Sequence, residues 1–131
     1  MRRRATGRRM APSRALLVTA ASLGFLGVAL GAFGAHGLER TFAEAPRRAA
    51  LWSTATTYLL VHALATGLAA VVGAGWAGRA FVAGCALFSG SLYALALSQV
   101  RALGVVTPLG GLAFLTGWLL LGVHAVRAKA S

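Results

Sequence analysis

The stretch Trp52-Ser-Thr-Ala-Thr-Thr-Tyr-Leu-Leu-Val-His-Ala-Leu-Ala-Thr-Gly-Leu-Ala-Ala-Val-Val-Gly73 decides the fold class of this chain. It contains no charged residue, and its length matches the ~20 residues that an α-helix needs to cross a bilayer core of ~30 Å. Three further stretches, at residues 15–35, 80–98 and 108–126, have the same character. The sequence therefore predicts an all-α protein, a four-helix transmembrane bundle with spans at about 15–35, 52–73, 80–98 and 108–126.

The composition agrees with a membrane protein. Of the 131 residues, 58% are hydrophobic and 11% are charged, and the mean hydropathy is +0.75. Such a chain has too little polar surface to cover a soluble domain of this size. We predict one membrane domain at residues 15–127, preceded by a basic cytoplasmic tail at residues 1–14. The single Cys85 cannot form an internal disulfide, and its place within a span favours a packing role.

The basic residues predict the orientation. The formal net charge is +11, but the arginines lie in the tail and the loops, as the positive-inside rule requires, and not in a nucleic-acid-binding patch. One side of the membrane would carry nine basic residues: Arg2, Arg3, Arg4, Arg8, Arg9, Arg14, Arg79, Arg127 and Lys129. The other side would carry only Arg40, Arg47, Arg48 and Arg101. We therefore expect both termini in the cytoplasm, a location in the cell (inner) membrane, and attraction of the tail to anionic lipid.

A basic tail followed by an apolar run is also the pattern of a secretory signal peptide. The best cleavage point would follow Ala35, and it would place the bulky Phe33 where a small residue is needed. We therefore expect the first span to be retained, although cleavage is the alternative.

The second span carries a polar stripe. Thr54, Tyr58, His62 and Thr66 follow one another at every fourth residue, and His62 falls near the middle of the membrane. Because the next span runs antiparallel, its hydroxyl groups reach a similar depth. The predicted intramembrane cluster consists of Thr54, Tyr58, His62, Ser89, Ser91 and Tyr93. Two interpretations stay open: a neutral imidazole bonded to a neighbouring helix, or a proton or solute path.

Small residues are expected at the helix contacts. Gly24, Gly27, Gly31 and Gly34 share one face of the first span, where they would let another backbone approach closely. The pattern extends to the later spans with Gly84, Gly90, Gly110, Gly111 and Gly117. The sequence leaves open whether these faces pack within the bundle, in a homo-oligomer, or against another membrane protein.

The connections between spans have their own signals. Residues 38–50 form a short amphipathic segment that we expect to lie at the membrane interface, interrupted by Pro46. Trp52, Trp76 and Trp118 are predicted to anchor span ends. Thr107-Pro108 combines an N-cap with a proline suited to the first helical position, and so predicts the start of the fourth span.

No pattern of residues points to catalysis. The only acids are Glu39 and Glu44, both in the first connection, which argues against a proton relay. His36, His62 and His124 would lie at three different depths, too far apart to bind one metal ion. We therefore expect no enzyme activity, no metal site and no cofactor.

Four blocks of sequence resemble one family. They are Gly31-Ala-Phe-Gly-Ala-His-Gly-Leu38, then Trp52-Ser-Thr-Ala55 with Tyr58 and His62-Ala-Leu64, then Phe88-Ser-Gly-Ser-Leu-Tyr93, and finally Gly104-Val-Val-Thr-Pro-Leu-Gly-Gly111 with Gly117-Trp118. Together they resemble the domain of unknown function 423 family of small, YgdD-like inner-membrane proteins. The family motif corresponds here to Gly34, His36, Gly37, Trp52, Tyr58, His62, Ser89, Gly90, Tyr93, Thr107, Pro108, Gly110, Gly111 and Trp118.

The resemblance implies a four-helix, multi-pass membrane protein and no established biochemical activity. Many motif residues are glycines, a proline or aromatics, which fits architecture better than chemistry. The favoured hypothesis is a structural or interaction module of the inner membrane. The alternative is a small-solute or proton carrier or channel that uses the cluster around His62.

Overall fold

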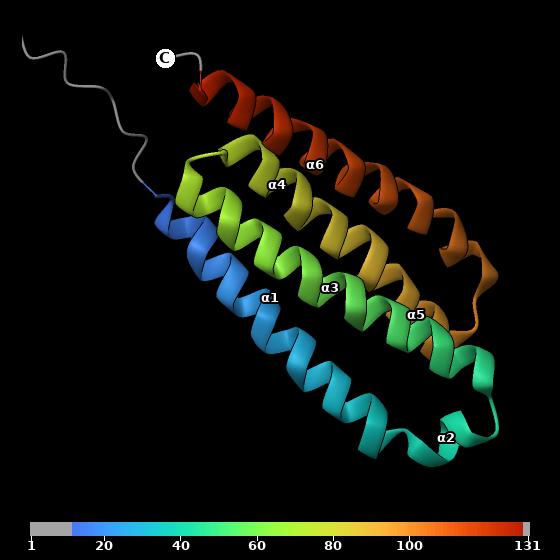
Figure 1. The fold of residues 1–131 in the computed structure, drawn as a ribbon. Coiled ribbons are helices and arrows are strands. Elements are labelled where there is room, and N and C mark those ends of the chain that lie inside the picture. The colour runs from blue at the N-terminus through green and yellow to red at the C-terminus, as the bar shows by residue number, and fades with distance from the viewer. Residues whose placement is uncertain (1–11, 130–131) are drawn as a thin grey trace, which may run out of the picture.

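The computed structural model describes residues 12–129, and helices account for almost all of them (Figure 1). Four helical segments are long and apolar enough to cross a membrane: Arg14–Gly37, Pro46–Val72, Gly75–Ser98 and Arg101–Lys129. Residues 12–129 contain no β-strand. The prediction of an all-α, four-span protein is confirmed.

The elements follow one another along the chain as α1 (Arg14–Ala32), η1 (Phe33–Gly37), α2 (Glu39–Ala43), α3 (Pro46–Val72), α4 (Gly75–Gly84), η2 (Cys85–Ser89), α5 (Gly90–Ser98), η3 (Arg101–Val105) and α6 (Thr107–Lys129). The segments η1 and η2 are single π-helical turns, and η3 is a 3₁₀-helix. Because η2 joins α4 to α5 without a break, these three elements form one span.

Local sequence explains where the helices begin and end. The Ser13 hydroxyl caps α1 by accepting a hydrogen bond from the backbone N–H of Leu16 at 3.3 Å. At the C-terminal end of α3, Gly73 adopts a left-handed conformation with φ of 78° and so ends the helix. Gln99 does the same for α5 with φ of 59°, which is uncommon for a residue other than glycine.

The interfacial segment is shorter than residues 38–50. Its helical part is α2, Glu39–Ala43, whereas Pro46 begins α3 instead of interrupting a helix. The reason is that the first turn of a helix needs no backbone N–H, which proline lacks. The helix that contains the predicted second span therefore begins at Pro46, before the predicted span start at Trp52.

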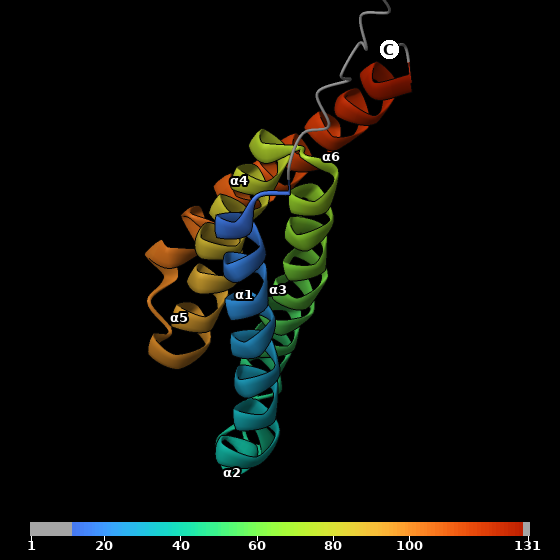
Figure 2. The same cartoon turned by 90° about the vertical axis from the view of Figure 1, so that its left-hand side faces the viewer.

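In the view of Figure 1 the helices lie side by side in the order α1, α3, α4 with α5, and α6. The view along this row, from the side of α1, shows α4 and α5 to the left of α1 and α3 to its right (Figure 2). The main contacts of α1 are with α3, and those of α6 are with α4 and η2, so α3 and α4 form the centre. The helix α2 lies at one end of the bundle, and the first residues of α1 and the last of α6 lie at the other (Figure 1).

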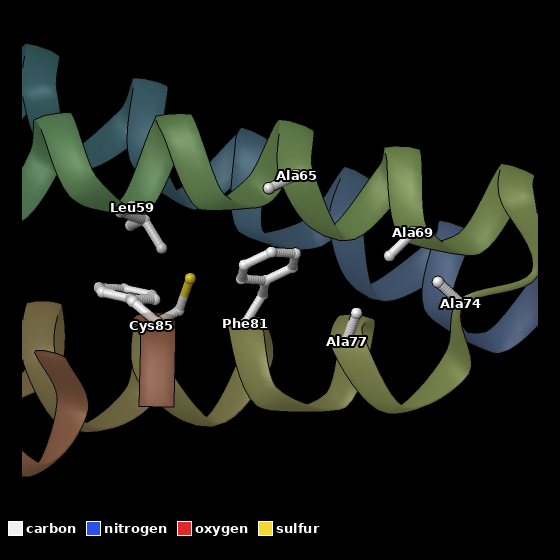
Figure 3. Packing of buried hydrophobic residues seen from close by; sticks show 8 residues of the cluster. Leu59, Ala65, Ala69, Ala74, Ala77, Phe81 and Cys85 are labelled. Carbon is white, nitrogen blue, oxygen red and sulfur yellow. The ribbon is translucent and has the colours of Figure 1, made fainter. Parts of the chain in front are cut away.

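Small residues bring the central helices together. Ala65 and Ala69 of α3 face Ala77 of α4, and the ring of Phe81 points from α4 toward α3 (Figure 3). Ala69 and Phe81 are completely buried. Large apolar side chains such as Leu64, Leu115 and Leu119 are instead exposed on the outside, where lipid would cover them.

Candidate functional site

His62 lies at the centre of the only polar group that joins α3 to the middle of α6 in the described residues. Its Nδ1 is 2.8 Å from the backbone oxygen of Tyr58, and its Nε2 is 3.1 Å from the indole Nε1 of Trp118. A carbonyl can only accept and an indole N–H can only donate, so Nδ1 carries the proton and Nε2 accepts. A second proton on Nε2 would face the Trp118 N–H, and the arrangement therefore holds His62 neutral.

Aromatic rings enclose this imidazole. The ring of Phe114 stacks on it with centroids 3.5 Å apart and an interplanar angle of 12°. Phe81 of α4 lies 5.7 Å from it, and the side chain of His62 is only 4% exposed. The imidazole thus packs three helices together and is shielded from solvent.

Trp118 differs from its predicted role as a span-end anchor. It lies at the depth of His62, and its indole N–H is used by that histidine. The sequence already argued against the anchor role, because Trp118 falls near the middle of the predicted 108–126 span and an interfacial anchor belongs at a span end.

The other predicted polar residues form three separate hydrogen bonds. Ser89 Oγ donates to the backbone oxygen of Ala55 at 2.8 Å. The Tyr93 hydroxyl lies 2.7 Å from Thr56 Oγ1, and Ser91 Oγ lies 2.6 Å from Thr107 Oγ1. These bonds join η2 to α3, α3 to α5, and α5 to the start of α6.

The structure does not bring the six predicted cluster residues into one network. Thr54 is exposed, and the phenol ring of Tyr58 is 42% exposed and packs on Phe88 with centroids 4.5 Å apart. The ring of Tyr58 stacks on His62 with centroids 5.9 Å apart, but the hydrogen bond to His62 comes from the backbone oxygen of Tyr58 and not from its hydroxyl group. Thr56 and Thr107 were not in the predicted cluster, yet their hydroxyls supply two of the partners.

Trp52 is a buried clamp and not an interfacial anchor. Its side chain is 4% exposed, and its indole N–H donates to the backbone oxygen of Leu30 at 2.8 Å. The ring edge meets Tyr93 with centroids 4.5 Å apart, and it fills the space where Gly34 lacks a side chain. Trp52 thereby connects α1, α3 and α5.

Only part of the predicted glycine set lies at close contacts. Gly27, Gly31 and Gly34 pack against α3, where a Cβ atom would meet Leu60, Thr56 and Trp52, and Gly110 packs against the backbone of Phe88. Gly24 and Gly90 face open space, and Gly111 makes an ordinary contact. Gly84 and Gly117, which belong to the same predicted pattern of small residues, receive the rings of Phe114 and Phe81.

The described residues can also be compared with the requirements of a metal site and of a buried polar binding site. Within residues 12–129 no three histidine, cysteine, aspartate or glutamate side chains come together as metal ligands. In the same range, every buried side-chain nitrogen or oxygen has a hydrogen-bond partner. His36 is exposed in η1, and His124 Nε2 lies 2.9 Å from the backbone oxygen of Val72 at the end of α3.

This four-span framework can now be compared with known proteins. Residues 30–111 match the family model described as Protein of unknown function (DUF423). The chain belongs to the DUF423 family. The match includes α3, η2 and α5, and with them His62 and the hydroxyl pairs of Thr56 and Ser91.

Several full-length relatives support this DUF423 assignment. The UPF0382 inner membrane protein YgdD of Escherichia coli is 44% identical over 125 residues, covering 89% of this chain and 93% of that protein. A UPF0382 membrane protein of Schizosaccharomyces pombe is 46% identical over 76% of this chain and 91% of its own length. The YwdK protein of Bacillus subtilis is 38% identical, with coverages of 87% and 98%. No solved structure matches the chain. This DUF423 protein is thus a multi-pass membrane protein from a family with no established activity.

Proposed function

We propose that this DUF423 protein is a structural or interaction module of the inner membrane and has no enzymatic role. The observation that carries the proposal is the pairing of its intramembrane polar groups with one another across helices. Four side-chain hydrogen bonds, made by Trp52, His62, Ser89 and Tyr93, each cross from one span to another.

Such pairs are suited to holding a bundle together. A polar group in hydrocarbon needs a partner, and a mispaired helix would leave that group unsatisfied. Each interhelical bond contributes on average ~0.6 kcal/mol, with a maximum of ~1.7 kcal/mol. These four bonds join the second span to each of the other three spans, and they therefore favour one packing arrangement over its alternatives.

The carrier or channel alternative finds no support in the same geometry. Both nitrogens of His62 are engaged, one by the backbone oxygen of Tyr58 and one by the indole N–H of Trp118, and neither of these groups exchanges protons as a carrier would require. The acids Glu39 and Glu44 lie in the connection between α1 and α3, at the end of the molecule where α2 is found. A chain of titratable groups across the membrane is not present in residues 12–129.

We further propose that both termini lie in the cytoplasm. The start of α1 and the end of α6 are found at the same end of the bundle (Figure 1). The orientation is supported by the sequence of the basic tail, whose arginines at positions 2, 3, 4, 8 and 9 lie outside the described residues, because each end of the described bundle carries four lysine or arginine residues. The description of the Escherichia coli relative as an inner membrane protein supports the membrane location.

A double-mutant cycle with His62→Phe and Trp118→Phe tests the structural role. Both variants keep an aromatic ring, and each removes one member of the hydrogen bond. We expect a coupling energy of about 0.6–1.7 kcal/mol in detergent-induced unfolding. Trp76→Phe is the matched control, because Trp76 is 73% exposed and lies far from His62 along the bundle.

The same samples in sealed vesicles test the alternative. We expect proton and small-ion flux equal to that of protein-free vesicles. Flux that His62→Phe abolishes, without loss of folding, would reject the structural proposal. Recovery of a stable membrane-protein partner or a homo-oligomer after gentle solubilisation would extend it.

A further inference from the structure

A cationic cleft opens at the end of the bundle where α1 begins and α6 ends. Its volume is about 620 Å³, and its walls come from the start of α1, the turn between α3 and α4, α4 itself and α6. Small side chains, including Ala69, Ala74 and Ala77, form part of its lining and give it depth. Ligand sites in proteins typically have volumes of ~300–1,000 Å³, so the cleft can receive a polar headgroup.

The charges of this cleft are positive. Arg79 and Arg127 both line it, and the guanidinium of Arg79 lies 4.8 Å from the ring centroid of Trp76, which holds it at the rim. His124 lines the same cleft and contacts the end of α3 through Nε2. The only aspartate or glutamate side chains of the chain, Glu39 and Glu44, belong to the opposite end.

An apolar groove continues from the cleft along α6. It has a volume of about 420 Å³ and is lined by Trp118, Leu119, Gly122, Val123, Val126 and Arg127. All of these lining residues belong to α6, and Val123 and Arg127 also line the cleft, so the groove and the cleft adjoin at these two side chains. A Cβ atom built on Gly122 meets nothing within 4 Å, which shows that glycine leaves this part of the groove empty.

We propose that the cleft and the groove together bind one anionic phospholipid. The phosphate would lie between Arg79 and Arg127, and an acyl chain would follow α6 past Gly122 toward Trp118. The argument is complementarity, since a positive cleft at a helix end joined to an apolar groove along the span matches a molecule with an anionic head and apolar tails. Basic pockets between transmembrane helices are known to bind such headgroups.

This site is more specific than a general attraction of basic residues to a charged membrane. Such attraction depends only on the number of charges, whereas a built site also depends on the shape of the groove. The proposal does not depend on whether the protein acts as a structural module, and it can be tested separately.

The experiment is native mass spectrometry of the full chain, released from micelles that contain equal amounts of phosphatidylglycerol and phosphatidylcholine. We expect the wild-type protein to retain phosphatidylglycerol preferentially. Arg79→Gln with Arg127→Gln should lower its retention about tenfold or more, given the contribution of each basic residue near an anionic surface. The matched control, Arg40→Gln with Arg101→Gln, removes two arginines from the opposite end and should leave retention unchanged.

Gly122→Leu tests the groove without altering charge. The side chain would enter open space, so the fold should persist, but retention of phosphatidylglycerol should fall about tenfold. Gly24→Leu is its control, because Gly24 also faces open space and lies on α1. Circular dichroism verifies that each variant keeps its helical content.

Three results would overturn the proposal. The first is equal retention by wild type and the Arg79/Arg127 variant, and the second is an equal loss in the Arg40/Arg101 control, which would mean general charge attraction only. The third is a change in dimer population with Gly122→Leu but no change in lipid, which would assign the groove to a second copy of the chain. Displacement of the lipid by millimolar glycerol phosphate would likewise reject the acyl-chain part of the site.

Discussion

Gly110 is the position where an added methyl group should destabilise this protein most clearly. It lies in the first turns of α6 against the backbone of η2. A Cβ atom at Gly110 would be 2.6 Å from Phe88 Cα and 2.7 Å from Phe88 Cβ, and it would overlap the Phe88 backbone nitrogen. An ordinary contact requires at least 3.4 Å. The two backbones would therefore have to separate by roughly 0.8 Å, because a backbone cannot rotate away as a side chain can.

Gly111 provides a matched comparison one residue later. A Cβ atom there would lie 4.0 Å from Phe88 Cδ2, which is an ordinary contact. Both Gly→Ala changes gain helix propensity, ~0.8–1.0 kcal/mol. Only Gly110→Ala adds overpacking, which typically costs ~1–3 kcal/mol. We therefore expect Gly110→Ala to be less stable than Gly111→Ala by about 1–3 kcal/mol, and Gly111→Ala to equal or exceed the wild type.

The assay is reversible unfolding in mixed micelles with increasing sodium dodecyl sulfate, followed by far-ultraviolet circular dichroism. The free energies of unfolding of the two variants are compared under identical conditions. Equal stability of the two variants, or a Gly110→Ala variant more stable than the wild type, would refute the close approach of α6 to Phe88.

Three further substitutions can be measured in the same unfolding assay. Arg48→Met should lower the free energy of unfolding by about 1–3 kcal/mol. The Arg48 guanidinium donates to the backbone oxygens of Ala96 at 2.6 Å and Leu97 at 3.3 Å and so caps the C-terminal end of α5. An equal loss in Arg47→Met, at the exposed neighbouring position, would contradict this role. Trp52→Phe should cost about 1–2 kcal/mol, because it removes the hydrogen bond that the indole N–H donates to the part-buried backbone oxygen of Leu30. An unchanged stability would show that this bond between α3 and α1 contributes nothing. Gln99→Gly should stabilise the protein by about 0.5 kcal/mol, since glycine adopts the left-handed conformation without a Cβ clash; a loss of stability would show that the side chain matters more than the backbone.

The depth of each residue in the membrane could be predicted from the sequence. In hydrocarbon, an α-helix is the only single segment whose backbone N–H and C=O groups are all hydrogen-bonded within the segment. Each uncharged stretch of sufficient length could therefore be assigned as a span independently of the others. Depth is predicted by counting along a span, which brings the third span's hydroxyl groups to the level of the second span; in the structure His62 is buried and Ser89 donates to the backbone oxygen of Ala55 in α3.

The rotation of each helix about its own axis could not be obtained in this way. Thr54 and Thr56 lie at similar depths, yet only Thr56 faces α5, because packing against Trp52 and Tyr93 decides which face of α3 turns inward. The π-helical turn at Cys85–Ser89 has the same kind of effect on the third span. A π-helical turn adds a residue to one turn and so shifts the rotation of the residues that follow it. Ser89 within this turn and Tyr93 beyond it both bond to α3, whereas Ser91 bonds to Thr107 at the start of α6.

The sequence by itself thus determined that this chain crosses the membrane in four helices, that its basic residues gather beyond the spans, and that it resembles DUF423 proteins. Each of these properties depends on the composition and residue spacing within a single segment, and not on how the segments pack together. The tertiary structure alone decided that Trp118 binds His62, that Trp52 binds α1, and that Arg79 and Arg127 line one cleft. Each of these contacts joins different helices, and their geometry depends on how side chains from separate spans fill the same space.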